Sequence, residues 1–403
     1  MTLTVRVLLG LVAGFAVGLL FASQPAGGGA TFVLAVLTPV GTIFINLIRM
    51  TVIPLVMSLL IATLGAASAG RGLGRTGARA LVIALVLLTV AAGGSGFVAD
   101  RVFGGLTIDA AAARTLTGDV PAAVSTSAPS LSTWIVELVP QNVVKAASDG
   151  AMLPLIVFSV CFGLALAEID ATKRDAVLRV IDGVADTMQR LVRRVLALAP
   201  VGVFALAVPL ASKLGWGAAG AVVAYVGLVV ILTIAAAVVL LYPLGIFAGP
   251  MRAAAFLSYC APAQSIAFAS RSSLAALPAM VQSAERVPLS PHATTVVLPL
   301  AAAVYHFGAA VAQTVGVIFL AHLYGVPLTA LQHVSVVCAV VLASFAVPGV
   351  PGGSIIAMVP ALAVANLPLD GIGVLLAVDA IPDMFRTTAN VTGSLVLAAI
   401  LPE

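Results

Sequence analysis

The chain has 403 residues, of which 62% are hydrophobic and only 8% are charged. Soluble domains carry roughly 25% charged residues, so this composition excludes a water-soluble globular protein. In such a chain the net charge of +4 reflects membrane topology and gives no indication of a nucleic-acid partner. The solvent of most of the chain is therefore expected to be the lipid bilayer.

Apolar segments of about 20 residues, the length that crosses a bilayer as a helix, recur along the chain. Continuous apolar runs favour helices over the short alternating strands of a membrane barrel. The first segment also fits a signal peptide with Arg6 as its basic region, but the many later segments favour a first transmembrane helix. The fold class predicted is an all-α polytopic membrane protein. We expect spans at 4–22, 32–68, 79–98, 150–168, 183–211 and 217–247, followed by four apolar segments between 252 and 403.

The basic residues lie in alternate loops. Arginines at 71–79 follow the second span, a group at 173–194 follows the fourth span or opens the fifth, and Arg252 follows the sixth. Because basic loops stay in the cytoplasm, this pattern predicts a cytoplasmic N-terminus. The loop at about 99–130 is then external.

Two later apolar segments, at 258–281 and 336–364, are each interrupted near the middle. Each half is too short to span the membrane, and a break leaves free backbone groups that hydrocarbon tolerates only beside a cavity. Paired interrupted segments are typical of a transporter binding site built from two repeats. We interpret them as re-entrant helical hairpins at about 252–285 and 330–366, the alternative being two Pro-kinked helices without function. The interrupting residues are Arg271, Ser272, Ser273 and Pro278 in the first segment, and Pro348, Gly349, Pro351, Gly352 and Gly353 in the second.

The last segment, 379–403, carries polar residues at intervals of three or four, which places them on one face of a helix. Charged side chains at bilayer depth cost about 2.5–3.5 kcal/mol each, so this face is predicted to line a substrate site. Arg386 offers a planar fork for a carboxylate, and Asp383 could receive a substrate ammonium group. The alternative is an internal Asp383–Arg386 ion pair that only holds helices together. The residues of this face are Asp379, Asp383, Arg386, Thr387, Asn390 and Ser394.

Several motifs together resemble the dicarboxylate/amino acid:cation symporter family, over nearly the whole chain and in order. They are DAIPDMFRTTANVTG (379–393), GVPGG (349–353), RSSLAALP (271–278), NLIRMTVIPLVMSLLIATLGAAS (46–68) and APVGVFALAV (199–208). The resemblance implies eight transmembrane helices plus two re-entrant hairpins, with inverted repeats, in a homotrimer in a prokaryotic inner membrane. It also implies an elevator-type secondary transporter. A transport part, at about 79–98 and 217–403, would move against a scaffold, at about 1–78 and 130–216.

The resemblance also implies roles for individual residues. The family's matching arginine, here Arg386, holds the substrate's side-chain carboxylate, and the matching aspartate, here Asp383, holds its amino group. Members that carry dicarboxylates usually lack this aspartate, so its presence favours aspartate or glutamate as substrate. The remaining predicted substrate-binding residues are Thr387 and Asn390 on the last helix, and Ser272, Ser273, Val350 and Gly352 at the hairpin tips.

The chain departs from the family where sodium binds. The family's Asn-Met-Asp-Gly-Thr is replaced by the segment 305–309, YHFGA, and a sodium-binding aspartate is replaced by Ser394. Hard cations need oxygen ligands, so sodium dependence is expected to be weak or absent. A third site, formed by backbone carbonyls, could survive. Its tentative residues are Ser344, Phe345 and Val347.

The coupling ion is therefore expected to be H⁺ or a single Na⁺, without a cofactor. Gln313 stands where animal transporters have a proton-carrying glutamate, and it cannot take that role. His306 and Asp379 are the tentative proton carriers, because ionisable groups at bilayer depth often serve proton relays. The alternative for His306 is a neutral, hydrogen-bonded side chain.

Two other functions remain open. One is a carrier for C4-dicarboxylates that lack an amino group. The other is a degenerate paralogue acting as a sensor or anion channel, which the lost sodium ligands favour and the intact polar face argues against. An enzyme is not expected, since the sequence has no zinc-ligand spacing, nucleophile elbow or phosphate-binding glycine loop.

Overall fold

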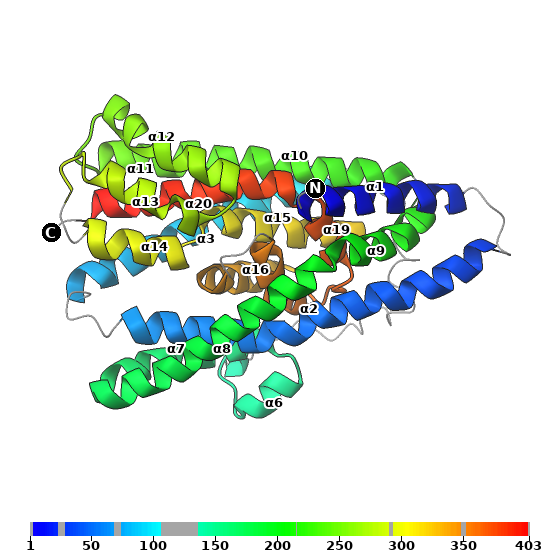
Figure 1. Ribbon diagram of the computed structural model, residues 1–403, viewed down its shortest axis with the longest axis horizontal. Coiled ribbons are helices and arrows are strands. Elements are labelled where there is room, and N and C mark those ends of the chain that lie inside the picture. The colour runs from blue at the N-terminus through cyan, green and yellow to red at the C-terminus, as the bar shows by residue number, and fades with distance from the viewer. Residues whose placement is uncertain are drawn as a thin grey trace.

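The structure is a computed structural model that describes residues 3–22, 29–67, 74–105, 136–214, 216–289, 293–347 and 352–401. Within these ranges the chain forms helices and turns and no β-strand (Figure 1). The helices of the first half are α1 (Leu3–Ala22), α2 (Gly29–Ala67), α3 (Gly74–Gly104), α6 (Val143–Ser148), α7 (Met152–Glu168), α8 (Ala171–Ala197) and α9 (Ala199–Leu214). Those of the second half are α10 (Trp216–Ala236), α11 (Tyr242–Phe247), α12 (Ala253–Ser270), α13 (Ser273–Ala284), α14 (Leu298–Val304), α15 (Phe307–Leu323), α16 (Ala330–Ala343), α17 (Gly353–Ala357), α18 (Val359–Val364), α19 (Gly371–Val378) and α20 (Ala380–Ile400).

Long apolar helices confirm the predicted all-α membrane architecture. Among the described residues, five segments are long and apolar enough to cross a bilayer, and a sixth is added if α8 and α9 form one span. The expected spans at 4–22, 32–68, 79–98 and 217–247 coincide with four of them, and the expected span at 150–168 is α7. The five segments are Val5–Ala22, Thr31–Gly65, Arg79–Gly104, Gly220–Phe247 and Leu298–Leu323.

The predicted span at 183–211 is not one straight helix. Helices α8 and α9 meet at a bend of 58°, with Leu198 between them. Pro200 is the second residue of α9, and a proline ring clashes with the carbonyl of the residue four positions earlier, which favours a break here. The apolar composition of this segment did not predict the bend. The two helices differ in character, since α9 is apolar whereas α8 is amphipathic and carries most of the charges.

Glycines let α1 pack closely on α9. A Cβ atom built on Gly14 would lie 2.8 Å from the Cβ of Ala207, and one on Gly18 would lie 2.7 Å from the Cβ of Ala211. Small residues one turn apart allow membrane helices to approach in this way. Figure 1 shows α2, α7 and α8 together along one long side of the molecule, with α10, α12 and α20 along the other.

Both interrupted segments form the predicted helix–break–helix units. In the first, α12 and α13 pack on each other and on α20, and they are separated by Arg271, which adopts a left-handed conformation (φ 54°), and by Ser272. In the second, α16 begins with a capping box formed by Thr329 and Gln332 and packs on α18. The tip residues 348–351, including the predicted site residue Val350, lie outside the described residues.

Candidate functional site

The predicted polar face of the last helix is present and buried. Helix α20 buries Asp383, Arg386, Thr387, Asn390 and Ser394. The hydroxyl of Ser394 donates to the carbonyl oxygen of Asn390 at 3.1 Å, so it is satisfied by its own helix. The other four side chains are available to build a site with neighbouring elements.

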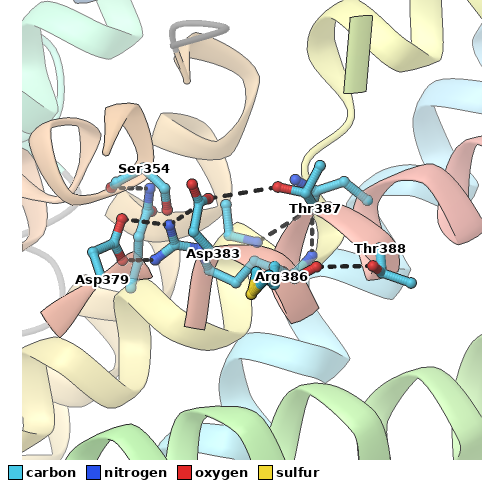
Figure 2. A network of polar contacts seen from close by, with 11 residues as sticks. Ser354, Asp379, Asp383, Arg386, Thr387 and Thr388 are labelled. Atoms are coloured by element: carbon cyan, nitrogen blue, oxygen red, sulfur yellow. Dashed lines mark hydrogen bonds and ion pairs between the residues drawn. The ribbon is translucent and has the colours of Figure 1, made fainter. Parts of the chain in front are cut away.

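Arg386 lies at the centre of a buried charge cluster and is only 1% exposed. Its Nη1 donates to Asp379 Oδ1 at 2.5 Å and its Nη2 donates to Asp379 Oδ2 at 2.9 Å, so Asp379 occupies the guanidinium fork with both oxygens. Nη2 also donates to Asp383 Oδ1 at 2.8 Å. Figure 2 shows Arg386 held between the two carboxylates. With all three groups ionised, the cluster carries a net charge of −1.

This cluster contains the ion pair that the sequence offered as the alternative reading, but its main partner differs. Asp379 was predicted only as a tentative proton carrier, yet it binds Arg386 more fully than Asp383 does. Asp379 lies at the junction of α19 and α20, seven residues and two helical turns before Arg386. That spacing was the signal in the sequence that could have identified the pair.

Several buried polar atoms around the cluster have no hydrogen-bond partner within the described part of the chain. They include an unpaired donor, Arg386 Nε, and an unpaired acceptor, Asp383 Oδ2, within the cluster itself. A buried polar group without a partner costs free energy, so such a concentration of them indicates a place where a polar ligand completes the bonding. The others near the cluster are Tyr225 Oη, Gln313 Oε1 and Ser354 Oγ.

A cavity of about 670 Å³ opens onto the charge cluster. It brings together most of the predicted site: Ser272, Ser273, Asp383, Arg386, Thr387 and Asn390, together with His306 and Val347. Asp379, Ser344, Phe345 and Gly352 do not line it. Gly352 is the N-cap residue just before α17 and has a positive φ of 77°, where a Cβ would meet the side chain of Leu376 at 2.7 Å.

Sequence reasoning missed the opposite wall of this cavity. Helix α8 contributes Asp182, Asp186, Gln189 and Arg193, which recur at intervals of three or four and so share one helix face. The amphipathic pattern of α8 was visible in the sequence, but its polar face was interpreted as a cytoplasmic loop signal. The hairpin tip adds Arg271, and the second hairpin adds Ser354.

The apolar segment Leu298–Leu323, which contains His306, is interrupted at that residue. Tyr305 ends α14 and His306 precedes α15, both with non-helical backbone angles. The break is stabilised across the interface with α20, because Asn390 Oδ1 accepts hydrogen bonds from Gly308 N at 2.7 Å and from Ala309 N at 3.4 Å. The side-chain oxygen of Asn390, a predicted substrate-binding residue, thus caps α15, and the same residue also lines the cavity.

The positions at which the resemblance implied lost sodium ligands hold groups unsuited to sodium. Phe307 is fully buried and its ring centroid lies 6.4 Å from that of Tyr305. His306 is also buried, and its Nδ1 donates to the carbonyl oxygen of Ser344 at 2.9 Å. The carbonyl oxygen of Ser344, one of the predicted ligands of the third sodium site, thus already accepts a hydrogen bond. An aromatic ring cannot supply the oxygen atoms that sodium requires.

Comparison with known proteins agrees with this architecture. Residues 3–403 match the profile of the sodium:dicarboxylate symporter family. A proton/glutamate-aspartate symporter of Escherichia coli K12 is 30% identical over 92% of this chain and 86% of its own length. A proton/sodium-glutamate symport protein of Bacillus caldotenax is 29% identical over 99% of this chain and 93% of its own, and a C4-dicarboxylate transport protein of Anaeromyxobacter sp. strain K is 30% identical over 98% and 87%. The chain therefore belongs to the sodium:dicarboxylate symporter family, as its motifs predicted, and is a membrane transporter rather than an enzyme.

Proposed function

We propose that the protein is a secondary active symporter of acidic amino acids such as aspartate or glutamate. The observation that carries this proposal is a pair of atoms in the charge cluster that have no partner among the described residues, the donor Arg386 Nε and the acceptor Asp383 Oδ2. An acidic amino acid brings both complements, a carboxylate for the guanidinium and an ammonium group for the aspartate. A C4-dicarboxylate has no cation to offer Asp383.

The surroundings of the cluster suit a small polar solute. The cavity volume of about 670 Å³ falls within the range of roughly 300–1,000 Å³ typical of ligand sites. Thr387 lines it beside Asp383, and Ser272 and Ser273 face it from the first hairpin tip. Ser272 Oγ already accepts a hydrogen bond from Ala275 N, but its hydroxyl proton remains available to a substrate oxygen.

The coupling ion in this proposal is the proton. The Escherichia coli relative is named a proton/glutamate-aspartate symporter, which supports this choice, while the name of the Bacillus caldotenax relative gives both ions, as a proton/sodium-glutamate symport protein. Buried Phe307 at the position of a sodium-binding carboxylate argues against that sodium site, and the His306–Ser344 hydrogen bond argues against the carbonyl site.

The assembly and topology proposed are those that the sequence predicted: a homotrimer with a cytoplasmic N-terminus and an elevator-type movement of one part against the other. The packing of the helices supports such a division. Helices α2, α7, α8 and α9 pack mainly among themselves and with α1, while α12, α13, α14 and α15 pack on α20. The cavity lies where the two groups meet, between α8 and the first hairpin tip.

Competitive binding to the purified protein tests the substrate class. Radiolabelled aspartate should bind and should be displaced by glutamate at much lower concentrations than by succinate. Equal displacement by succinate would favour the C4-dicarboxylate carrier, for which the Anaeromyxobacter relative is the precedent. Failure of every acidic solute to bind would favour a sensor or channel.

A further inference from the structure

The two terminal nitrogens of Arg386 are held by the protein's own carboxylates. Both terminal nitrogens of the guanidinium donate to Asp379, and one of them also donates to Asp383. A substrate carboxylate that binds both terminal nitrogens of Arg386 must therefore displace Asp379, whereas Nε, which has no partner among the described residues, offers it only one hydrogen bond. Asp383 can stay in place, because it uses only one oxygen on Arg386 and keeps Oδ2 for the substrate's ammonium group.

Displacing Asp379 creates a charge problem. The cluster has two carboxylates and one guanidinium, a net charge of −1, and the side chains of Asp379 and Arg386 are 4% and 1% exposed. Aspartate or glutamate adds one further negative charge. A buried charge that loses its partner is strongly disfavoured, and a carboxylate in that position takes up a proton instead. One added proton returns the occupied site to −1, the charge of the empty site.

Asp379 is the group expected to take up this proton, because of the groups that surround it. The charged groups that act on it are Arg386, Asp383 and, from the first hairpin tip, Arg271. Across from them α10 contributes Tyr225, whose buried hydroxyl has no partner in the described residues and interacts electrostatically with Asp379. A phenol can accept a hydrogen bond from a protonated carboxyl group or donate one to it, but it cannot neutralise a carboxylate.

The other candidates are less suitable. The Nδ1 of His306 donates to Ser344, and no described hydrogen bond joins this ring to the charge cluster. Gln313 is an amide that donates to the carbonyl oxygen of Ser354 at 3.0 Å and cannot titrate. Asp383 is committed to the ammonium group, which it can bind only while ionised.

We propose that Asp379 carries the coupling proton, by exchanging its place on Arg386 with the substrate's carboxylate; this rests on the proposed function. When the substrate arrives, the Asp379 carboxylate leaves the fork and forms one O–H bond with a proton from the solution on that side. When the substrate departs, Asp379 returns to Arg386 and its O–H bond breaks, releasing the proton on the other side. No electrons are transferred, and one proton moves with each substrate molecule.

Binding measurements as a function of pH test this assignment. Because the occupied site holds one more proton than the empty site, aspartate affinity should rise as pH falls, by about tenfold per pH unit. Asp379→Asn imitates the protonated side chain, so it should bind aspartate with an affinity that does not change with pH. Asp379→Glu should restore the slope. Asp175→Asn, which removes an exposed carboxylate of α8 that does not line the cavity, should keep the wild-type slope.

A wild-type slope in Asp379→Asn would overturn the proposal, and loss of the slope in His306→Gln alone would transfer the role to His306.

A second measurement does not depend on the variants folding. Infrared difference spectra of the wild-type protein, recorded on adding isotope-labelled aspartate, should show a new protonated carboxyl group belonging to the protein, and its absence would contradict the proposal. Aspartate binding without a pH slope refutes the proton carrier alone, whereas no binding at any pH refutes the proposed function itself.

Discussion

The amide nitrogen of Gly308 donates to the side-chain oxygen of Asn390 at 2.7 Å, which joins the first turn of α15 to the middle of α20. The contact is close because Gly308 has no side chain: a Cβ atom there would lie 2.7 Å from the Cα atom of Arg386. The backbone that carries the central arginine is thus positioned by a glycine in another helix.

Gly308→Ala should therefore disturb the site without touching a charged group. The added methyl group must push α15 away from α20, and overpacking of this kind costs about 1–3 kcal/mol. We expect aspartate affinity to fall about tenfold and thermal stability to fall with it, measured by binding and by a melting curve. Gly227→Ala in α10 is the matched control, since nothing lies within 4 Å of a Cβ there. Equal behaviour of the two variants would show that the close approach is unimportant.

Arg386→Ala should abolish binding of acidic substrates. Truncating one partner of a buried charge pair costs about 2–5 kcal/mol, which is a loss of about 30-fold or more in affinity. Arg193→Ala removes an exposed arginine from the same cavity and should change affinity by less than about fivefold, because exposed pairs contribute about 0.2–1 kcal/mol. Similar losses in both variants would mean that the cavity attracts anions in general and that Arg386 has no specific role.

Arg386→Ala should also destabilise the protein, because it leaves Asp379 and Asp383 buried without their cation. Breaking a buried ion pair from one side costs about 3–5 kcal/mol. Adding Asp379→Asn removes one of the two stranded charges, so the double variant should be more stable than Arg386→Ala alone. Comparing melting temperatures of the two variants checks this, and a double variant that melts lower would contradict the coupling between these residues.

Asp383→Asn should separate the two substrate classes. The amide keeps the shape of the side chain but loses the charge that attracts an ammonium group, and a hydrogen bond to a charged group contributes about 1.5–3 kcal/mol. Aspartate affinity should fall tenfold or more, while succinate affinity should change little. Equal loss for both ligands would indicate that Asp383 only supports Arg386.

Much of this architecture could be predicted from the sequence, because long apolar runs indicate membrane helices and interruptions in those runs indicate where the helices break. The polar face of α20 followed from intervals of three and four residues, and the hairpins followed from Arg271–Ser273 and from the Pro and Gly residues near 350. These features depend on local patterns that the bilayer makes unusually strict.

The remaining features depend on tertiary contacts. The break at Tyr305–His306 has no proline and is held by Asn390, 82 residues away from Gly308. The chain bends by 58° between α8 and α9, and the polar face of α8 lines the cavity opposite α20. The bidentate hold of Asp379 on Arg386 joins the end of one helix to the second turn of the next, and the spacing allowed the pair without requiring it.

Uptake into proteoliposomes is the most direct test of acidic amino acid:proton symport. The purified protein is reconstituted, and radiolabelled aspartate is supplied under a proton gradient or a sodium gradient imposed separately. Aspartate should accumulate above its external concentration when the proton gradient is directed inward, with little effect of sodium. Accumulation that rises cooperatively with sodium and ignores the pH gradient would contradict the proposed coupling.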